Sequence, residues 1–211
     1  MCGFAGIWNS SISDFPHKKT EYIFRRLNHR GPDSSNYISF NISEESYCHL
    51  WHTRLSIQDL DKRSDQPYQD DNSALVYNGE IYNYYALKKY HLPKKVYSDT
   101  DVLWNTLKQN QFINNVNDIE GMWSFAYINK TEKTLQISRD RFGQKPFYYA
   151  YLKTRNGIAF SSSIYVLLKL IDFEPKLNYQ KLEKYLHLGF RSSGLDHSET
   201  YIHDILSLEP G

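Results

Sequence analysis

The chain has 211 residues, enough for one large globular domain or for one domain with a short extension. Its 25 Lys and Arg side chains nearly balance 24 Asp and Glu side chains, and the formal net charge is +1. This balance gives no electrostatic reason to expect nucleic acid or an anionic membrane as a partner, so a small neutral or zwitterionic ligand is favoured.

The cysteines and the apolar segments bear on the cellular compartment. Cys2 and Cys48 are the two cysteines, and we interpret both as free thiols because a bridge to the chain end would add little loop-closure stabilisation. The sequence lacks a secretory signal pattern, and its longest late apolar stretch is interrupted by Lys169. We therefore expect a cytoplasmic protein without a membrane span.

The first half of the chain is predicted to contain both strands and short helices. Residues 2–8 are typical of an inner strand, and residues 16–31 of a helix with Gly31 just beyond its end. Further strands are expected at 36–42, 47–55 and 73–81, and further helices at 83–92 and 99–112.

The second half is predicted to be a run of strands followed by helices. Four strand-like segments, 122–128, 134–140, 146–152 and 157–163, are joined by polar, turn-rich connections, which predicts an antiparallel meander. Helices are expected over 163–172 and 178–189. Many short strands with a few helices predict two antiparallel sheets packed face to face with helices outside. Alternating βαβ units are missing, which argues against a doubly wound nucleotide-binding fold.

Cys2 is the first candidate for chemistry. An ordinary thiol has a pKa of ~8.5, so it needs a base to become a nucleophile at neutral pH. If Met1 is removed, the α-amino group of Cys2 supplies that base within the same residue. The alternative is that Cys2 is a small apolar residue in an edge strand.

The Asn78–Gly79 pair has two interpretations. The Asn78 amide and the unshielded Gly79 N–H offer donors for an oxyanion that would form when a carbonyl is attacked. Asn-Gly between apolar runs is also the strongest short hairpin signal, and taken alone the dipeptide favours a turn. Both interpretations can hold together, because a turn can present the donors.

Charged residues near predicted element ends are candidates for holding a zwitterionic ligand. Arg54 lies among Leu55 and Ile57, where its guanidinium would favour a bidentate carboxylate or form a structural ion pair. Asp99 and Asp101 lie at a predicted helix start. There a carboxylate can cap the helix or hold an ammonium group.

Seven segments together carry a resemblance to a known family. In chain order they are MCGFAGIW, HRGPDSS, HTRLSIQDL, VYNGEIYNY, SDTDVL, GMWSFAYI and SRDRFGQKPFYY. In order and spacing they resemble the class II glutamine amidotransferase domain of the asparagine synthetase family, over nearly the whole chain. The resemblance implies an α+β fold, a four-layer αββα sandwich of two antiparallel sheets called the N-terminal-nucleophile hydrolase fold.

The resemblance also implies glutamine as the substrate and a role for each matching residue. Cys2 resembles the nucleophile, with its α-amino group as the base, and Asn78 with Gly79 resembles the oxyanion hole. Arg54 resembles the residue that grips the α-carboxylate of glutamine, and Asp99 lies at the position that holds its ammonium group. Cys2 then attacks the side-chain amide, ammonia leaves, and water hydrolyses the γ-glutamyl thioester.

Three further residues are expected to bind the substrate without an assigned contact, and two positions depart from the family pattern. Leu55, Ile57 and Glu80 are expected among the substrate-binding residues, although a carboxylate at a helix start explains Glu80 equally well. Asp101 and Ser163 each stand where the family usually has glutamate. The departure at Ser163 weakens the transfer of contacts near the domain junction, and the hydrolytic residues are untouched.

No metal and no organic cofactor are expected in this domain. His52 and His187 lack recognisable ligand spacing, so we interpret them as structural. ATP and Mg²⁺ are implied only for the C-terminal synthetase domain of the family, whose S-G-G-x-D-S loop binds pyrophosphate. The segment SSGLDHSE lacks the second adjacent glycine and has His197 inserted, so we reject it as that loop.

The expected organisation is a glutaminase domain over residues 1–172 and a helix with a connector over 173–211. The last segment, TYIHDILSLEPG, resembles the connector between the two domains of the family. We therefore expect the chain to be a fragment or a split subunit, with a synthetase domain or subunit as the partner that accepts ammonia. A homodimer is compatible with the sequence.

Two other functions compete with the glutaminase. An idle or regulatory glutamine-binding module would retain the pocket, and retention of Met1 would favour it because Met1 blocks the α-amino group. A cysteine hydrolase acting on another amide would retain Cys2 but would use glutamine no better than simple amides.

Overall fold

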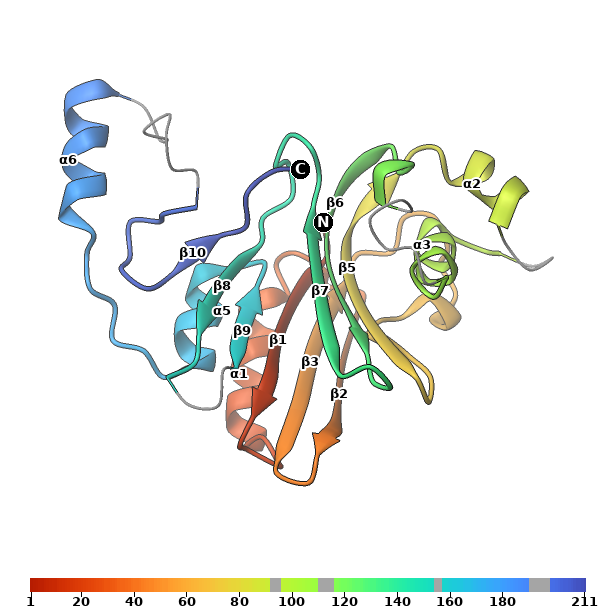
Figure 1. Cartoon of the computed structure of the whole chain (residues 1–211), viewed down its shortest axis with the longest axis horizontal. Helices are drawn as coiled ribbons and strands as arrows, with labels where there is room; N and C mark the ends of the chain where they lie inside the picture. Colours follow the sequence, from red (N-terminus) through yellow and green to blue (C-terminus); the bar gives the residue numbers. More distant parts are fainter. Residues whose placement is uncertain (92–95, 110–115, 154–156, 190–197) are drawn as a thin grey trace.

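The computed structural model of the chain contains two antiparallel sheets (Figure 1). It describes residues 1–91, 96–109, 116–153, 157–189 and 198–211. Sheet A has the strand order β10-β8-β9-β1-β3-β2, and sheet B has the order β4-β5-β6-β7. The strands of sheet A are β1 (Gly3–Ser10), β2 (Ser34–Ser43), β3 (Ser46–Arg54), β8 (Tyr148–Tyr151), β9 (Ile158–Ser161) and β10 (Leu206–Ser207). Those of sheet B are β4 (Tyr68–Gln69), β5 (Ser73–Ile81), β6 (Gly121–Asn129) and β7 (Thr134–Arg139).

Helices cover the outer faces of both sheets (Figure 1). The described helices are α1 (His17–Leu27), α2 (Tyr84–His91), α3 (Asp99–Leu107), α5 (Ile164–Leu170) and α6 (Tyr179–Leu188), with a short 3₁₀ turn at Lys62–Ser64. In Figure 1, α2 and α3 lie beside sheet B on the side away from sheet A. Within the described residues, none of these helices is long and apolar enough to cross a membrane.

Three apolar clusters separate four layers. The first packs Ile23 and Leu27 of α1 and Val166 of α5 against the outer face of sheet A. The second fills the space between the sheets and includes Phe4 of β1 and Val76 of β5. The third packs α2 and α3 against the outer face of sheet B. Each sheet is thus buried on both faces, and the predicted αββα sandwich is confirmed.

The position of β1 decides where Cys2 lies. β1 pairs with β3 on one side and with β9 on the other, so it is an inner strand as the sequence predicts. Close packing supports this position, because a side chain at Gly3 would collide with Thr53 on β3. Cys2 comes directly before β1 and therefore sits at the end of a central strand, not in an edge strand.

The four predicted strands between residues 122 and 163 all form, but not as one meander. β6 pairs with β7 in sheet B, whereas β8 pairs with β9 in sheet A. The chain crosses from one sheet to the other in the segment 140–147, between β7 and β8. The meander prediction is wrong because strand patterns indicate strands but not the sheet each one joins.

The segment after residue 172 contributes to sheet A. Asn178 caps α6 through its side chain, and Gly189 ends the helix in the left-handed conformation with φ of 68°. β10 then pairs with β8 and extends the sheet at its edge. The boundary expected at residue 172 stays a prediction. Most of the rejected SSGLDHSE loop falls within 190–197, outside the described residues.

Candidate functional site

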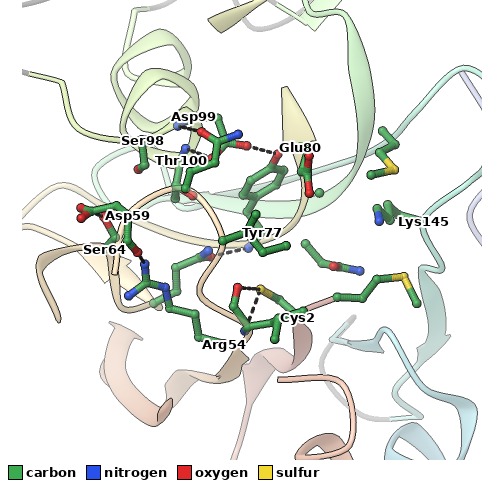
Figure 2. A pocket seen from close by; sticks show the side chains of 18 residues that line it. Cys2, Arg54, Asp59, Ser64, Tyr77, Glu80, Ser98, Asp99, Thr100 and Lys145 are labelled. Atoms are coloured by element: carbon green, nitrogen blue, oxygen red, sulfur yellow. Dashed lines mark hydrogen bonds between the residues drawn. The ribbon is translucent and has the colours of Figure 1, made fainter. Parts of the chain in front are cut away.

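A cavity of about 140 Å³ opens beside Cys2 (Figure 2). Strand ends and loops from both sheets supply its walls, together with the first turn of α3. The structure brings together in this cavity every residue that the sequence predicts for the site: Cys2, Arg54, Leu55, Ile57, Asn78, Gly79, Glu80 and Asp99. These residues come from separate parts of the chain, so their convergence depends on the packing of the two sheets.

The Cys2 thiol is held at the floor of the cavity. The backbone N–H of Leu55 donates to Sγ over 3.4 Å, and Arg30 Nε donates to the Cys2 carbonyl oxygen over 3.2 Å. Burial raises the pKa of the Cys2 thiol, while the Leu55 contact and the nearby Arg54 charge oppose that rise. A nucleophile at this site therefore depends on neighbouring positive charge.

Met1 occupies the wall of the cavity next to the thiol. Burial lowers the pKa of its α-amino group, and the positive charges of Lys145 and Arg30 act in the same direction. An α-amino group in this environment is neutral at lower pH than an exposed one, which is the form that accepts a proton.

Asn78 and Gly79 lie inside β5, paired with Ser124 and Trp123 of β6. The hairpin-turn interpretation of this dipeptide is therefore wrong. The Asn78 side-chain nitrogen is buried and has no hydrogen-bond partner among the described residues. A side chain at Gly79 would collide with the Met122 carbonyl oxygen and the Tyr77 ring, so only glycine fits. The strand therefore presents an unpaired amide donor to the cavity.

Arg54, at the end of β3, combines both roles weighed for it. Its Nη1 donates to the Asp65 carboxylate over 2.8 Å and to the Asp61 carbonyl oxygen over 2.9 Å, and its Nη2 donates to the Asp59 carbonyl oxygen. The structural ion pair is therefore present. A guanidinium has five N–H donors, so these contacts leave donors for a ligand carboxylate.

Asp99 lies at the first residue of α3, and its neighbour Ser98 is the N-cap. The Asp99 carboxylate accepts hydrogen bonds from the Tyr77 hydroxyl at 2.8 Å, from Ile81 N–H at 3.1 Å and from Thr100 N–H at 2.8 Å. Burial raises the pKa of Asp99, and these hydrogen bonds oppose the rise.

Asp101 points into a different environment from Asp99. Its carboxylate accepts from the Tyr68 hydroxyl at 2.8 Å and from the Tyr97 N–H at 2.9 Å, and Asp101 does not line the cavity. Of the two aspartates at the helix start, Asp99 is therefore the one available to a ligand in the cavity.

Glu80 is a strand residue of β5, so its interpretation as a helix-start carboxylate is wrong. It lines the cavity, and its negative charge contributes to the raised pKa of Asp99. Leu55 contacts Cys2 through its backbone, whereas Ile57 is 58% exposed at the rim.

The sequence motifs contain three further residues of the site whose roles were not predicted. Arg30, in HRGPDSS, holds the Cys2 carbonyl oxygen, and Tyr77, in VYNGEIYNY, holds the Asp99 carboxylate. Lys145, in SRDRFGQKPFYY, lines the cavity. Their place in the motifs is the signal that could have identified them.

The histidines lie apart from this chemistry. His52 is fully buried, and its Nε2–H donates to the Tyr77 carbonyl oxygen over 3.0 Å. Burial lowers the pKa of His52 to about 4. His187 is exposed on α6. Across the described ranges, no group of three or more His, Cys, Asp or Glu side chains is arranged to hold a metal ion.

Solved structures share the fold of this chain. The structure is similar to the glutamine phosphoribosylpyrophosphate amidotransferase of Bacillus subtilis, with a TM-score of 0.63 and 18% identity, over 81% of this chain and 44% of that one. This likeness shows the fold, which is that of the N-terminal-nucleophile amidotransferases.

Sequence comparisons identify the family. A model described as "Glutamine amidotransferase domain" matches residues 1–211, and the chain belongs to this family. It is 34% identical over 209 residues to a putative glutamine-hydrolysing asparagine synthetase 2 of Methanocaldococcus jannaschii, covering 90% of this chain and 40% of that protein. It is 31% identical over 221 residues to the glutamine-hydrolysing asparagine synthetase 2 of Bacillus subtilis, covering 100% of this chain and 28% of that protein.

The resemblance to the amidotransferase domain of asparagine synthetases is therefore confirmed. The chain spans well under half the length of these relatives, 40% of one and 28% of the other.

Proposed function

We propose that this domain hydrolyses glutamine to glutamate and ammonia, with Cys2 as the nucleophile. The observation that carries the proposal is the buried Asn78 amide, which has no hydrogen-bond partner in the described part of the chain and lines the same cavity as the Cys2 thiol. A buried donor without a partner is costly unless a ligand completes it. An oxyanion formed at a carbon attacked by Cys2 is such a ligand.

The reaction proceeds in two steps, acylation of Cys2 and hydrolysis of the thioester, once Met1 has been removed. The α-amino group of Cys2 takes the thiol proton, and the sulfur attacks the side-chain amide carbon of glutamine. Asn78 Nδ2 and the Gly79 N–H donate to the oxyanion. The carbon–nitrogen bond breaks, the α-ammonium group returns a proton to the leaving nitrogen, and ammonia departs. Water then attacks the γ-glutamyl thioester, releasing glutamate and restoring the thiol.

The two charged ends of glutamine match the two sides of the cavity. The remaining N–H donors of Arg54 bind the α-carboxylate, and the Asp99 carboxylate binds the α-ammonium group. Leu55, Ile57 and Glu80 complete the walls that surround the substrate. Arg54 and Asp99 are each held by several protein hydrogen bonds, which supports a preorganised site.

The released ammonia passes to an amide-forming partner. The relatives named as asparagine synthetases are much longer than this chain, which supports a synthetase domain or subunit as the acceptor. ATP and Mg²⁺ belong to that partner in this proposal. We place the reaction in the cytoplasm, where the two free cysteines would stay reduced.

The test is release of glutamate and ammonia from glutamine by the purified chain, with Cys2→Ala as the paired variant and the N-terminus checked by mass spectrometry. Release that is lost in Cys2→Ala and is faster for glutamine than for simple amides supports the proposal. Equal release by both proteins would exclude Cys2 as the nucleophile. Glutamine binding without release, from a chain that lacks Met1 and is supplied with its synthetase, would indicate a binding module.

A further inference from the structure

Lys145 is a buried lysine in the wall of the cavity. It is 5% exposed and lies in the crossing segment between β7 and β8. Its ammonium group forms no hydrogen bond or ion pair with the residues that the structure describes. Buried charges are normally paired, so an unpaired ammonium group facing a cavity needs an explanation.

The backbone of Lys145 is fixed on both sides. Its N–H donates to the Asp140 carboxylate over 3.0 Å, and its carbonyl oxygen accepts from Arg139 Nε over 2.6 Å. The same carboxylate of Asp140 also accepts the N–H groups of Trp123, Phe142 and Gln144. Asp140 therefore shapes the loop that carries Lys145 while its oxygens are occupied by backbone groups.

Figure 2 shows Lys145 on the opposite side of the cavity from Arg54 and Asp59, with Cys2 between them. The charged and titratable groups that act on Lys145 come from several elements. Burial lowers its pKa, while Glu80 on β5 and the Cys2 thiol raise it, together with Asp140; Arg30 after α1 lowers it. The groups acting on Cys2 itself include the α-amino group, Arg54 and Asp99.

The other two cations near Cys2 each make at least one hydrogen bond within the protein. Arg54 is bound to Asp65 and to backbone carbonyl oxygens, although its charge also acts on Cys2. Arg30 donates through Nε to the Cys2 carbonyl oxygen, while its buried Nη2 has no hydrogen-bond partner among the described residues. Lys145 is the remaining cation in the cavity wall that makes no such contact within the described ranges. Its charge is therefore available to the reacting groups.

We propose that the Lys145 ammonium group is a positioning residue that stabilises the Cys2 thiolate through its charge. This inference rests on the proposed function, because glutamine hydrolysis uses the Cys2 thiolate as its nucleophile. The charge acts on two groups: it keeps more of the α-amino group neutral at the cost of making it a weaker base, and it favours the negative sulfur and the negative oxygen that form during the reaction. Lys145 does this through space, without contacting the substrate.

The experiment measures the rate at which iodoacetamide alkylates Cys2 between pH 5.5 and 9.5. The thiolate displaces iodide, so the rate follows the thiolate fraction and needs no glutamine. The variants are Lys145→Met, which removes the charge at similar length, and Lys145→Arg, which keeps it. Lys184→Met is the matched control, since Lys184 is an exposed lysine on α6. All proteins must share the same N-terminus by mass spectrometry.

We expect Lys145→Met to move the alkylation profile to higher pH and to slow the reaction at pH 7 about three- to tenfold. The plateau at high pH should stay unchanged. Lys145→Arg and Lys184→Met should follow the wild-type profile. Cys48 is fully buried, so its lack of reaction reports that the fold is intact in each variant.

Identical profiles for Lys145→Met and the wild type would overturn the inference. Equal slowing in Lys145→Arg would also overturn it, because the effect would then follow shape and not charge. If Cys48 reacts in Lys145→Met, Lys145→Gln replaces it as the neutral variant under the same criteria. Since alkylation does not require hydrolysis, a chain that fails to release ammonia can still show the shifted profile, which separates this inference from the proposed function.

Discussion

The Tyr77 hydroxyl donates a hydrogen bond of 2.8 Å to the buried carboxylate of Asp99. Tyr77 belongs to β5 and Asp99 to α3, so this contact ties the strand that carries Asn78 to the helix that covers it. Burial raises the pKa of Asp99, and the Tyr77 contact lowers it. The hydroxyl therefore helps to keep Asp99 ionised for an ammonium group in the cavity.

Removal of that hydroxyl should weaken glutamine binding more than turnover. In Tyr77→Phe the pKa of Asp99 rises further, and a protonated Asp99 no longer attracts the substrate ammonium group. We expect KM for glutamine to rise about five- to twentyfold at pH 7, with kcat changed less than about twofold. Steady-state kinetics between pH 6 and 8.5 should also show that the increase in KM on acidification begins at a higher pH than in the wild type.

The matched control is Tyr127→Phe. Tyr127 lies on β6 of the same sheet, and its hydroxyl bonds to Ser73, away from the cavity. If Tyr127→Phe raises KM as much as Tyr77→Phe does, the effect comes from loosening of sheet B and not from Asp99.

The two aspartates at the start of α3 offer a direct comparison. Asp99→Asn removes the charge that faces the cavity, and we expect KM for glutamine to rise by about one to two orders of magnitude. Asp101→Asn removes a charge two residues further on, where the carboxylate contacts Tyr68, and should change KM less than about twofold. Kinetics of both variants at pH 7.5 measures the difference. The reverse order of the two effects would transfer the ammonium site to Asp101.

Much of this site could be predicted from the sequence, and the parts that could not be predicted have physical causes. Cys2 stands out because a cysteine next to the chain start is unusual, whereas the roles of Arg54 and Asp99 came from the family motifs, since an ion pair and a helix cap explain these two residues equally well. The Asn78–Gly79 dipeptide was ambiguous, since the same two residues favour a turn when only local propensity is considered. Pairing with β6 over nine positions, from Ser73 to Ile81, overrides that propensity.

Contacts between distant segments could not be predicted from local patterns. Lys145 reaches the cavity because Asp140 and Arg139 fold the segment that crosses between the sheets, and the sequence indicates neither the crossing nor the fold of that segment. Likewise, the contact between Arg30 and Cys2 requires α1 to pack against sheet A. Such residues were visible only as members of the motifs that carried the family resemblance.

Arg54 should matter for both stability and substrate binding. Lysine keeps the charge in Arg54→Lys but cannot reproduce the contacts to Asp65, Asp61 and Asp59. We expect the free energy of unfolding to fall by about 1–3 kcal/mol and KM for glutamine to rise more than about tenfold. Urea denaturation and steady-state kinetics measure the two effects on the same preparation.

Asp65→Asn separates these two effects. This variant removes the charged partner of Arg54 but leaves the guanidinium in place. It should lose stability with a KM that rises clearly less than in Arg54→Lys. Equal increases in KM would mean that Arg54 acts by holding the 59–65 loop and not by binding the substrate carboxylate.

His52 should make the fold sensitive to acid. Burial lowers its pKa to about 4 from an ordinary value of 6.5, so the unfolded chain takes up a proton in that pH range before the folded chain does. Stability from this residue is complete above pH 6.5 and is lost as the pH falls toward about 4, by about 3 kcal/mol in total. Urea denaturation of the wild type at several pH values should show this loss, and His52→Gln should reduce the dependence of the unfolding free energy on pH.

The amide side chain of His52→Gln would keep a donor for the Tyr77 carbonyl oxygen without a titratable ring. The control is His187→Gln, at an exposed position on α6, whose unfolding free energy should depend on pH as in the wild type. A slope unchanged in His52→Gln would assign the acid sensitivity to other groups, of which the buried His49, whose pKa burial also lowers, is the next to replace.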